Sequence, residues 1–218
     1  MLFVALAAPL ANLAVRAFGL GGATLGANPV AALTDALGLW ALRLLLATLA
    51  MTPLRRLTGS ARWLLYRRML GLFAFFYLAL HLAMYFAIDQ GFDWRVLLED
   101  VGKRRWITLG FAAFVLLVPL AATSTRAAQR RLGRRWQRLH YAIYPATLLG
   151  CWHFYWQVKR DVREPLAYAA VFALLMLVRA LRRRPPRAAA APAAAPAYIE
   201  VRADQSSGKN LSSSALAR

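Results

Sequence analysis

The sequence is poor in cysteine, in histidine and in acidic residues. Its 218 residues include one cysteine, Cys151, so an internal disulfide and a cluster held by several cysteines are excluded. Only 9 residues are Asp or Glu, and the apolar segments contain almost none of them, which disfavours a zinc site and a proton-coupled transporter. The glycines at 19–22 follow no strand, so they indicate a turn rather than a phosphate-binding loop.

Apolar residues, in contrast, are abundant. They make up 60% of the chain, and the mean hydropathy is +0.45. They form runs long enough to cross a hydrocarbon core, which takes about 20 residues as helix. We therefore predict an all-α membrane protein, a bundle of six transmembrane helices at about 2–18, 37–54, 69–88, 106–122, 139–158 and 164–181.

The ends of these segments carry further predictions. The first segment lacks the basic start and the small-residue cleavage site of a signal peptide, so we expect a transmembrane helix there. Pro53 is expected to close the second segment, which a short amphipathic stretch precedes. We expect one membrane domain over residues 1–184 and a disordered cytoplasmic tail over residues 185–218, where Pro and Ala are frequent and no periodicity is visible.

The basic residues predict the orientation. In a soluble protein, a formal charge of +19 would suggest nucleic-acid binding, but here the charges lie in short connections between apolar runs. Sixteen of them lie on one side, at 55, 56, 62, 67 and 68, at 126, 130, 131, 134, 135 and 138, and at 179, 182, 183, 184 and 187, against seven on the other. The positive-inside rule places the richer side, and both termini, in the cytoplasm of a bacterial inner membrane.

All three histidines, His81, His140 and His153, fall in predicted membrane segments. A histidine inside a bilayer is costly and therefore marks a functional site, although one that only hydrogen-bonds between packed helices is an alternative. His81 follows Arg68 by 13 residues and His153 follows His140 by 13, on parallel segments. We expect His81 and His153 at one depth in the periplasmic half, where two neutral imidazoles can bind a haem iron from opposite faces.

His140 is predicted about 20 Å nearer the cytoplasm, where a second haem would complete an electron path across the membrane. An ideal helix would place His140 and His153 about 140° apart, so we expect a distortion at Pro145, which lies between them. Arg43, inside the second segment, either extends its charge to the interface or pairs with a haem propionate.

Several stretches of the sequence resemble a known family. They are Leu25–Pro29, Leu45–Arg55, Arg67–Gly71 with His81 beyond, and Thr123–His140 with His153 beyond. The chain resembles, over about residues 1–184, the MsrQ (YedZ) family of haem-binding membrane subunits of periplasmic methionine sulfoxide reductase systems. That family belongs to the ferric-reductase-like transmembrane group.

The resemblance implies a cofactor and partners. It implies haem b, one group or two, and FMN, with electrons arriving from the quinone pool or from a cytoplasmic flavin reductase. It implies transfer to a periplasmic molybdopterin subunit, MsrP, which would perform the catalysis, so that this chain is an electron-transfer subunit. A free-standing ferric or quinone reductase, and a non-redox transporter or anchor, remain as alternatives.

The resemblance also draws attention to Arg67 and Arg68. The wider group carries a fourth histidine where this chain has Arg68, so the second haem lacks one expected ligand. Arginines at a segment edge can hold haem propionates or an FMN phosphate through paired donor contacts. They can also serve only to set the topology.

Overall fold

A computed structural model describes residues 1–20, 25–158 and 161–181, which lie within one compact unit, Met1–Arg182. All regular structure in these ranges is helical, which confirms the predicted all-α fold. The predicted tail, 185–218, and the predicted domain boundary at residue 184 lie outside the described residues.

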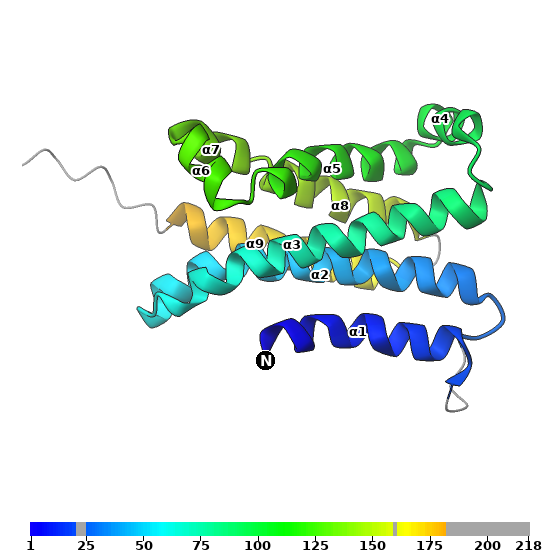
Figure 1. The fold of residues 1–218 in the computed structure, drawn as a ribbon, viewed down its shortest axis with the longest axis horizontal. Helices are drawn as coiled ribbons and strands as arrows, with labels where there is room; N and C mark the ends of the chain where they lie inside the picture. The colour runs from blue at the N-terminus through cyan, green and yellow to red at the C-terminus, as the bar shows by residue number, and fades with distance from the viewer. Residues whose placement is uncertain (21–24, 159–160, 182–218) are drawn as a thin grey trace, which may run out of the picture. The chain divides into compact units, whose positions relative to one another are not determined.

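Figure 1 shows the apolar helices side by side, each running opposite to the one before it. The helices are α1 (Leu2–Ala17), α2 (Pro29–Thr58), α3 (Arg62–Met84) with its π-helical continuation η2 (Tyr85–Asp89), α4 (Trp94–Lys103), α5 (Arg105–Ala122), α6 (Arg126–Leu132), α7 (Arg134–His140), α8 (Ile143–Gln157) and α9 (Arg163–Leu181). Helix α4 lies at one end of the bundle, and α6 and α7 lie at the other. We call these the α4 end and the α7 end.

Four helices of the described part are long and apolar enough to cross a membrane. They are Pro29–Thr58, Arg62–Asp89, Arg105–Ala122 and Arg163–Leu181. Helices α1 and α8 are apolar too, but they have only 16 and 15 residues. Each of the six predicted segments thus contains one apolar helix, while the crossing of the membrane by all six stays a prediction.

Helix α2 is longer than predicted at both ends. It begins at Pro29, where the Asn28 side chain accepts a hydrogen bond from the Ala31 amide and caps the helix. The prediction that Pro53 closes this segment is wrong, because the helix continues to Thr58. A proline deprives the carbonyl four residues before it of its partner, and the Leu49 carbonyl instead accepts a hydrogen bond from Arg179 of α9 at 3.4 Å.

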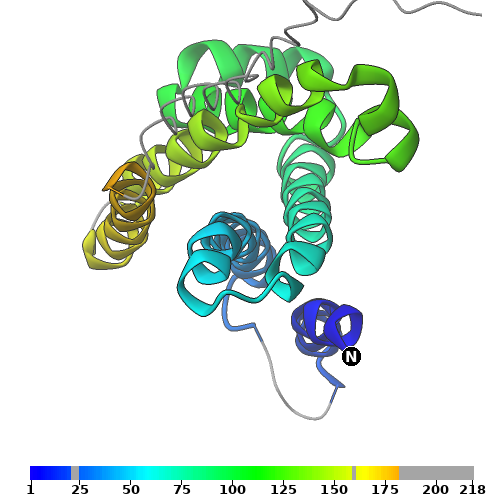
Figure 2. The same cartoon turned by 90° about the vertical axis from the view of Figure 1, so that its left-hand side faces the viewer.

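Helix α2 is also the centre of the core, because α1, α3, α8 and α9 all contact it. Figure 2, a view turned by 90°, shows α1 as the outermost helix, next to α2 and α3. The fully buried Tyr77 of α3 fastens α1: its hydroxyl donates to the Leu6 carbonyl at 2.8 Å and accepts from the Leu10 amide at 3.0 Å. A hydroxyl inserted between these two groups satisfies both of them away from water.

The connection before α8 is folded rather than extended. Its basic residues lie on α6 and α7, and the Trp136 indole donates to the Thr123 carbonyl at 2.9 Å, which holds α7 against the end of α5. His140 ends α7, and Tyr141–Ala142 separate it from α8. The distortion expected between His140 and His153 therefore lies one turn before Pro145, as expected where a proline ring would clash with the carbonyl four residues before it.

Candidate functional site

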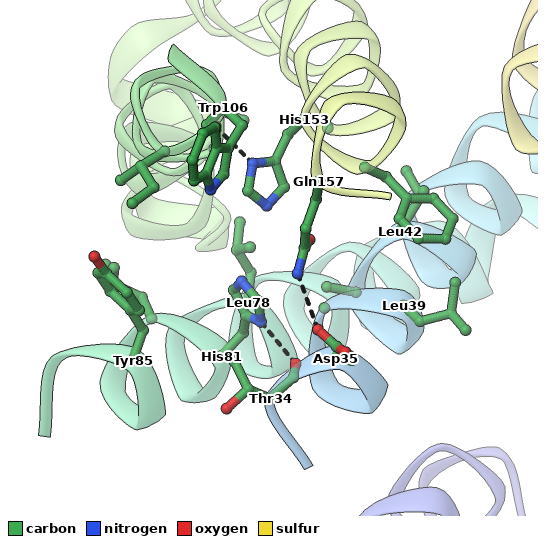
Figure 3. A pocket seen from close by; sticks show the side chains of 18 of the residues that line it. Thr34, Asp35, Leu39, Leu42, Leu78, His81, Tyr85, Trp106, His153 and Gln157 are labelled. Atoms are coloured by element: carbon green, nitrogen blue, oxygen red, sulfur yellow. Dashed lines mark hydrogen bonds between the residues drawn. The ribbon is translucent and has the colours of Figure 1, made fainter. Parts of the chain in front are cut away.

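A cavity of about 930 Å³ opens between α2, α3, α5 and α8 at the α4 end. His81 of α3 and His153 of α8 line it, and Figure 3 shows their rings facing each other across it. The ring centroids are 6.3 Å apart, and the ring planes make an angle of 80°. Most of the other lining residues are apolar, so the cavity has the character of a site for a large, mainly apolar cofactor.

Hydrogen bonds fix which nitrogen of each histidine points into the cavity. His81 Nδ1 lies 2.8 Å from the Thr34 carbonyl, and His153 Nδ1 lies 2.6 Å from the Trp106 carbonyl. A carbonyl can only accept, so each Nδ1 carries the proton and donates it. Each Nε2 then keeps its lone pair, which is the state that a metal-binding imidazole requires.

Two glycines hold the imidazoles from behind. A Cβ on Gly38 would lie 2.9 Å from His81 Nδ1, and a Cβ on Gly110 would lie 3.0 Å from His153 Nδ1. Contacts this short force a shift of the ring, so any larger residue at either position would move a histidine from its carbonyl partner. Glycine at these two positions thus lets each ring lie against the neighbouring helix.

The two histidines and their supports are related by one constant offset. His153, Trp106 and Gly110 follow His81, Thr34 and Gly38 by 72 residues each, and each histidine is 47 residues from its carbonyl partner. The same offset relates further lining residues: Leu39 and Phe111, Ala41 and Ala113, Leu42 and Phe114, Leu45 and Leu117, and Tyr85 and Gln157. The cavity therefore consists of two similar halves, one from α2 and α3 and one from α5 and α8.

These residues fit a haem. An imidazole nitrogen lies about 2.0–2.1 Å from its metal in zinc sites, so two such nitrogens on opposite sides of a metal are about 4 Å apart. Adding each ring's own radius gives a centroid separation of about 6 Å, close to the 6.3 Å in this structure. The two-sided nitrogen donor set and the apolar walls match a porphyrin better than a small hydrated ion.

The polar edges of the cavity differ, unlike its two halves. On one side the Gln157 amide donates to the Asp35 carboxylate at 3.0 Å. On the other, the Tyr85 hydroxyl donates at 2.5 Å to the buried Asp100, which also pairs with Arg104 at 3.1 Å. In Figure 3, Tyr85 and Gln157 lie on opposite sides of the histidine pair.

His140 lies apart from this cavity, at the α7 end. Its ring stacks on Trp136, with centroids 3.9 Å apart, and its Nδ1 lies 3.1 Å from the Trp136 carbonyl. Arg67 of α3 is close enough to interact with it electrostatically, and Arg68 is the exposed neighbour of Arg67. The 72-residue offset that relates His81 to His153 also relates Arg68 to His140.

Arg43 does not line the cavity. Its guanidinium donates to the Tyr168 hydroxyl at 2.7 Å and lies 3.8 Å from the Glu164 carboxylate, both on α9. It also lies over the Trp40 ring, 5.2 Å from the centroid. The structure thus places Arg43 as a link between α2 and α9, and its predicted contact with a haem propionate stays a prediction.

Several residues of the site were not anticipated from the sequence. They are Thr34, Asp35, Gly38, Trp106, Gly110 and Gln157. Two of these act through backbone carbonyls, which every residue has, so no side-chain pattern could identify them. The glycines did leave a signal, because each precedes its histidine by the same 43 residues.

Comparison with known proteins gives consistent results. Residues 37–151, just over half of the chain, match the family described as "Ferric reductase like transmembrane component". The chain is 52% identical over 176 residues to the protein-methionine-sulfoxide reductase heme-binding subunit MsrQ of Xanthomonas campestris pv. campestris (strain 8004), with 81% of each chain covered. It is 53% identical over 167 residues to the protein of the same name from Rhodospirillum rubrum, with 75% of this chain and 80% of the relative covered.

Proposed function

The chain belongs to the ferric-reductase-like transmembrane family and, within it, to the MsrQ family, and from that premise we propose that it carries electrons on haem b to a methionine sulfoxide reductase. The observation that supports this most is the pair formed by His81 and His153, with both Nε2 lone pairs directed into an apolar cavity. When bound there, a haem would supply one-electron redox chemistry.

The chain's own residues have distinct parts in this proposal. His81 and His153 hold the iron from its two faces. The carbonyls of Thr34 and Trp106 fix the tautomer and the orientation of the two rings. The apolar side chains of the four helices keep water from the metal, which preserves a low dielectric around the changing charge.

We propose that electrons arrive at the α7 end and leave at the α4 end. Most of the basic residues lie at the α7 end, on α6, α7 and the joined ends of α2 and α3, so the positive-inside rule places that end and both termini in the cytoplasm of the inner membrane. A quinone or a cytoplasmic flavin reductase would donate there. At the α4 end, the periplasmic molybdopterin subunit MsrP would accept the electrons.

The α7 end would hold the second cofactor. His140 with Arg68 occupies the positions that correspond, by the offset of 72, to the other level of the repeat. Arg67 and Arg68 can bind an anionic group, either the propionates of a second haem or the phosphate of FMN.

Replacement of the paired histidines tests the haem site. His81→Ala and His153→Ala should each remove the same low-spin haem signal from the reduced-minus-oxidised spectrum of the purified protein, because one remaining imidazole leaves the iron with a free axial position. His140→Ala, at the other end, serves as the control and should keep that signal. Unchanged spectra in both single variants at the α4 end would refute the proposed ligand pair.

A second experiment tests the partner. The chain, purified with the molybdopterin protein and a flavin reductase, should support reduction of methionine sulfoxide in an oxidised protein. A chain that reduces ferric iron or quinone but never its molybdopterin partner would instead be a free-standing reductase.

A further inference from the structure

One charge breaks the similarity between the two halves of the cavity close to the histidines. Asp35 follows Thr34, whose carbonyl accepts the His81 proton, and its counterpart in the other half, 72 residues later, is Ile107. Both residues line the cavity. One half therefore carries a carboxylate where the other carries an alkyl side chain.

The position of Asp35 connects it with both histidines. Its carboxylate accepts a hydrogen bond from Gln157, one helical turn beyond His153 on α8. Among the described residues, Asp35 is the carboxylate that interacts electrostatically with both His81 and His153. Other charged groups line the cavity, namely Asp89, Arg104, Asp161 and Glu164, without this relation to both rings.

We infer that Asp35 sets the reduction potential of the haem that the proposed function places between His81 and His153, by holding it low. Ferric haem carries one more positive charge than ferrous haem, so a fixed carboxylate nearby stabilises the oxidised form. The Gln157 amide holds the carboxylate in place and does not neutralise it. A low potential makes the reduced haem a stronger electron donor to a periplasmic partner.

The expected effect is large enough to measure. A unit charge on the order of 10 Å away, at an effective dielectric constant of about 20, changes an equilibrium constant by about tenfold. For a one-electron couple, tenfold corresponds to about 59 mV. Asp35 is exposed in the cavity, so water screens part of its charge, and a shift well beyond this size is not expected.

Removing the charge is the first test. Asp35→Asn keeps the size of the side chain and an oxygen that can accept from Gln157, so it removes only the charge. In a spectroelectrochemical titration of the purified holoprotein, it should raise the midpoint potential of the haem whose signal His81→Ala removes, by about 59 mV. Asp89→Asn, which removes a carboxylate elsewhere in the same cavity, is the matched control and should cause a much smaller shift.

Adding a charge in the other half is the second test. Ile107→Asp places a carboxylate at the corresponding position and should lower the same potential by a similar amount. The double variant Asp35→Asn/Ile107→Asp should return close to the potential of the unmodified protein. Should Asp35→Asn fail to bind haem, Ile107→Asp decides alone: a downward shift supports the inference, and an unchanged potential overturns it.

The outcomes separate this inference from the proposed function. Retention of the haem by both His81→Ala and His153→Ala would refute the ligand pair itself. Loss of the haem in those variants, with equal potentials in Asp35→Asn and the unmodified protein, would overturn only the role of Asp35. An equal upward shift in Asp35→Asn and Asp89→Asn would also overturn it, because the cavity's total charge rather than Asp35 would then set the potential.

Discussion

The two ends of the bundle are built from the same two helical hairpins, yet they place different residues together. At the α4 end, the offset of 72 residues joins His81 with His153. At the α7 end, it joins Arg68 with His140. Helix α3 begins at Arg62 and α7 begins 72 residues later, at Arg134, so the correspondence extends to the helix boundaries.

The difference between the ends comes from two breaks in the second hairpin. Helices α2 and α3 run unbroken to a short turn at 59–61, whereas the corresponding residues of the second hairpin are interrupted at 123–125 and at 141–142. The tip of the second hairpin therefore folds into α6 and α7. A repeated hairpin thus gives a symmetric pair of ligands where both copies are straight, and a different environment where one copy is bent.

The strongest way to break the symmetric end is to fill a glycine. Gly38→Ala and Gly110→Ala place a methyl group 2.9 Å and 3.0 Å from a ligand-side nitrogen, so each should reduce haem affinity about 10- to 100-fold through loss of ring orientation. Gly→Ala favours a helix by about 1 kcal/mol, so unfolding of the helix is not expected. Haem retained per protein after dilution in detergent measures the effect.

A third glycine provides the control. A Cβ on Gly71 would lie 3.8 Å from the nearest listed neighbour atom, on Thr48, an ordinary contact. Gly71→Ala should therefore keep its haem. Equal haem loss in all three variants would show that the contact with the histidines is not the cause.

The other end is tested by His140→Ala. If a second haem lies there, the haem content should fall from two per chain to one, while the signal of the haem at the α4 end remains. One haem both before and after the substitution, with slower reduction by a quinone or flavin donor, would indicate a flavin or quinone site instead. Full haem content with full electron transfer would leave His140 as a residue that only packs on Trp136.

A smaller effect is expected for the arginines of the same end. Arg67→Lys/Arg68→Lys keeps both charges but loses the paired donors of the guanidinium, so reduction by a cytoplasmic donor should slow by about tenfold, the value of one charge-assisted hydrogen bond. Stopped-flow reduction of the haem measures the rate. The control is Arg126→Lys/Arg130→Lys on α6, and the same rate in both double variants would leave Arg67 and Arg68 with a topological role only.

The smallest perturbation sharpens the comparison by locating the two ends. Single cysteines at Ser60 and Gln129 probe the α7 end, and one at Phe92 probes the α4 end, while the native Cys151 is buried. In intact cells, an impermeant thiol reagent should label only position 92. Labelling at 60 or 129 would reverse the topology and the direction of electron flow.

The sequence was sufficient for the elements and for the pairing of two histidines, and insufficient for their surroundings. Hydrophobic length identified the six apolar helices, and equal spacing from the basic connections placed His81 and His153 at one depth. Pro53 was misread because a partner 126 residues later, Arg179, takes over the carbonyl that the proline leaves. Such long-range compensation is invisible to local rules, as are the carbonyls that orient the histidines.

The bond between Arg179 and the Leu49 carbonyl has a consequence in time. The two residues are 130 positions apart, and a ribosome adds about 5–20 residues per second. The carbonyl that Pro53 leaves therefore waits about 6 to 26 s for its partner, although an unsatisfied backbone group in hydrocarbon costs several kcal/mol. Helix α9 is the last to be synthesised, so the first hairpin is completed only when the final helix of the bundle arrives.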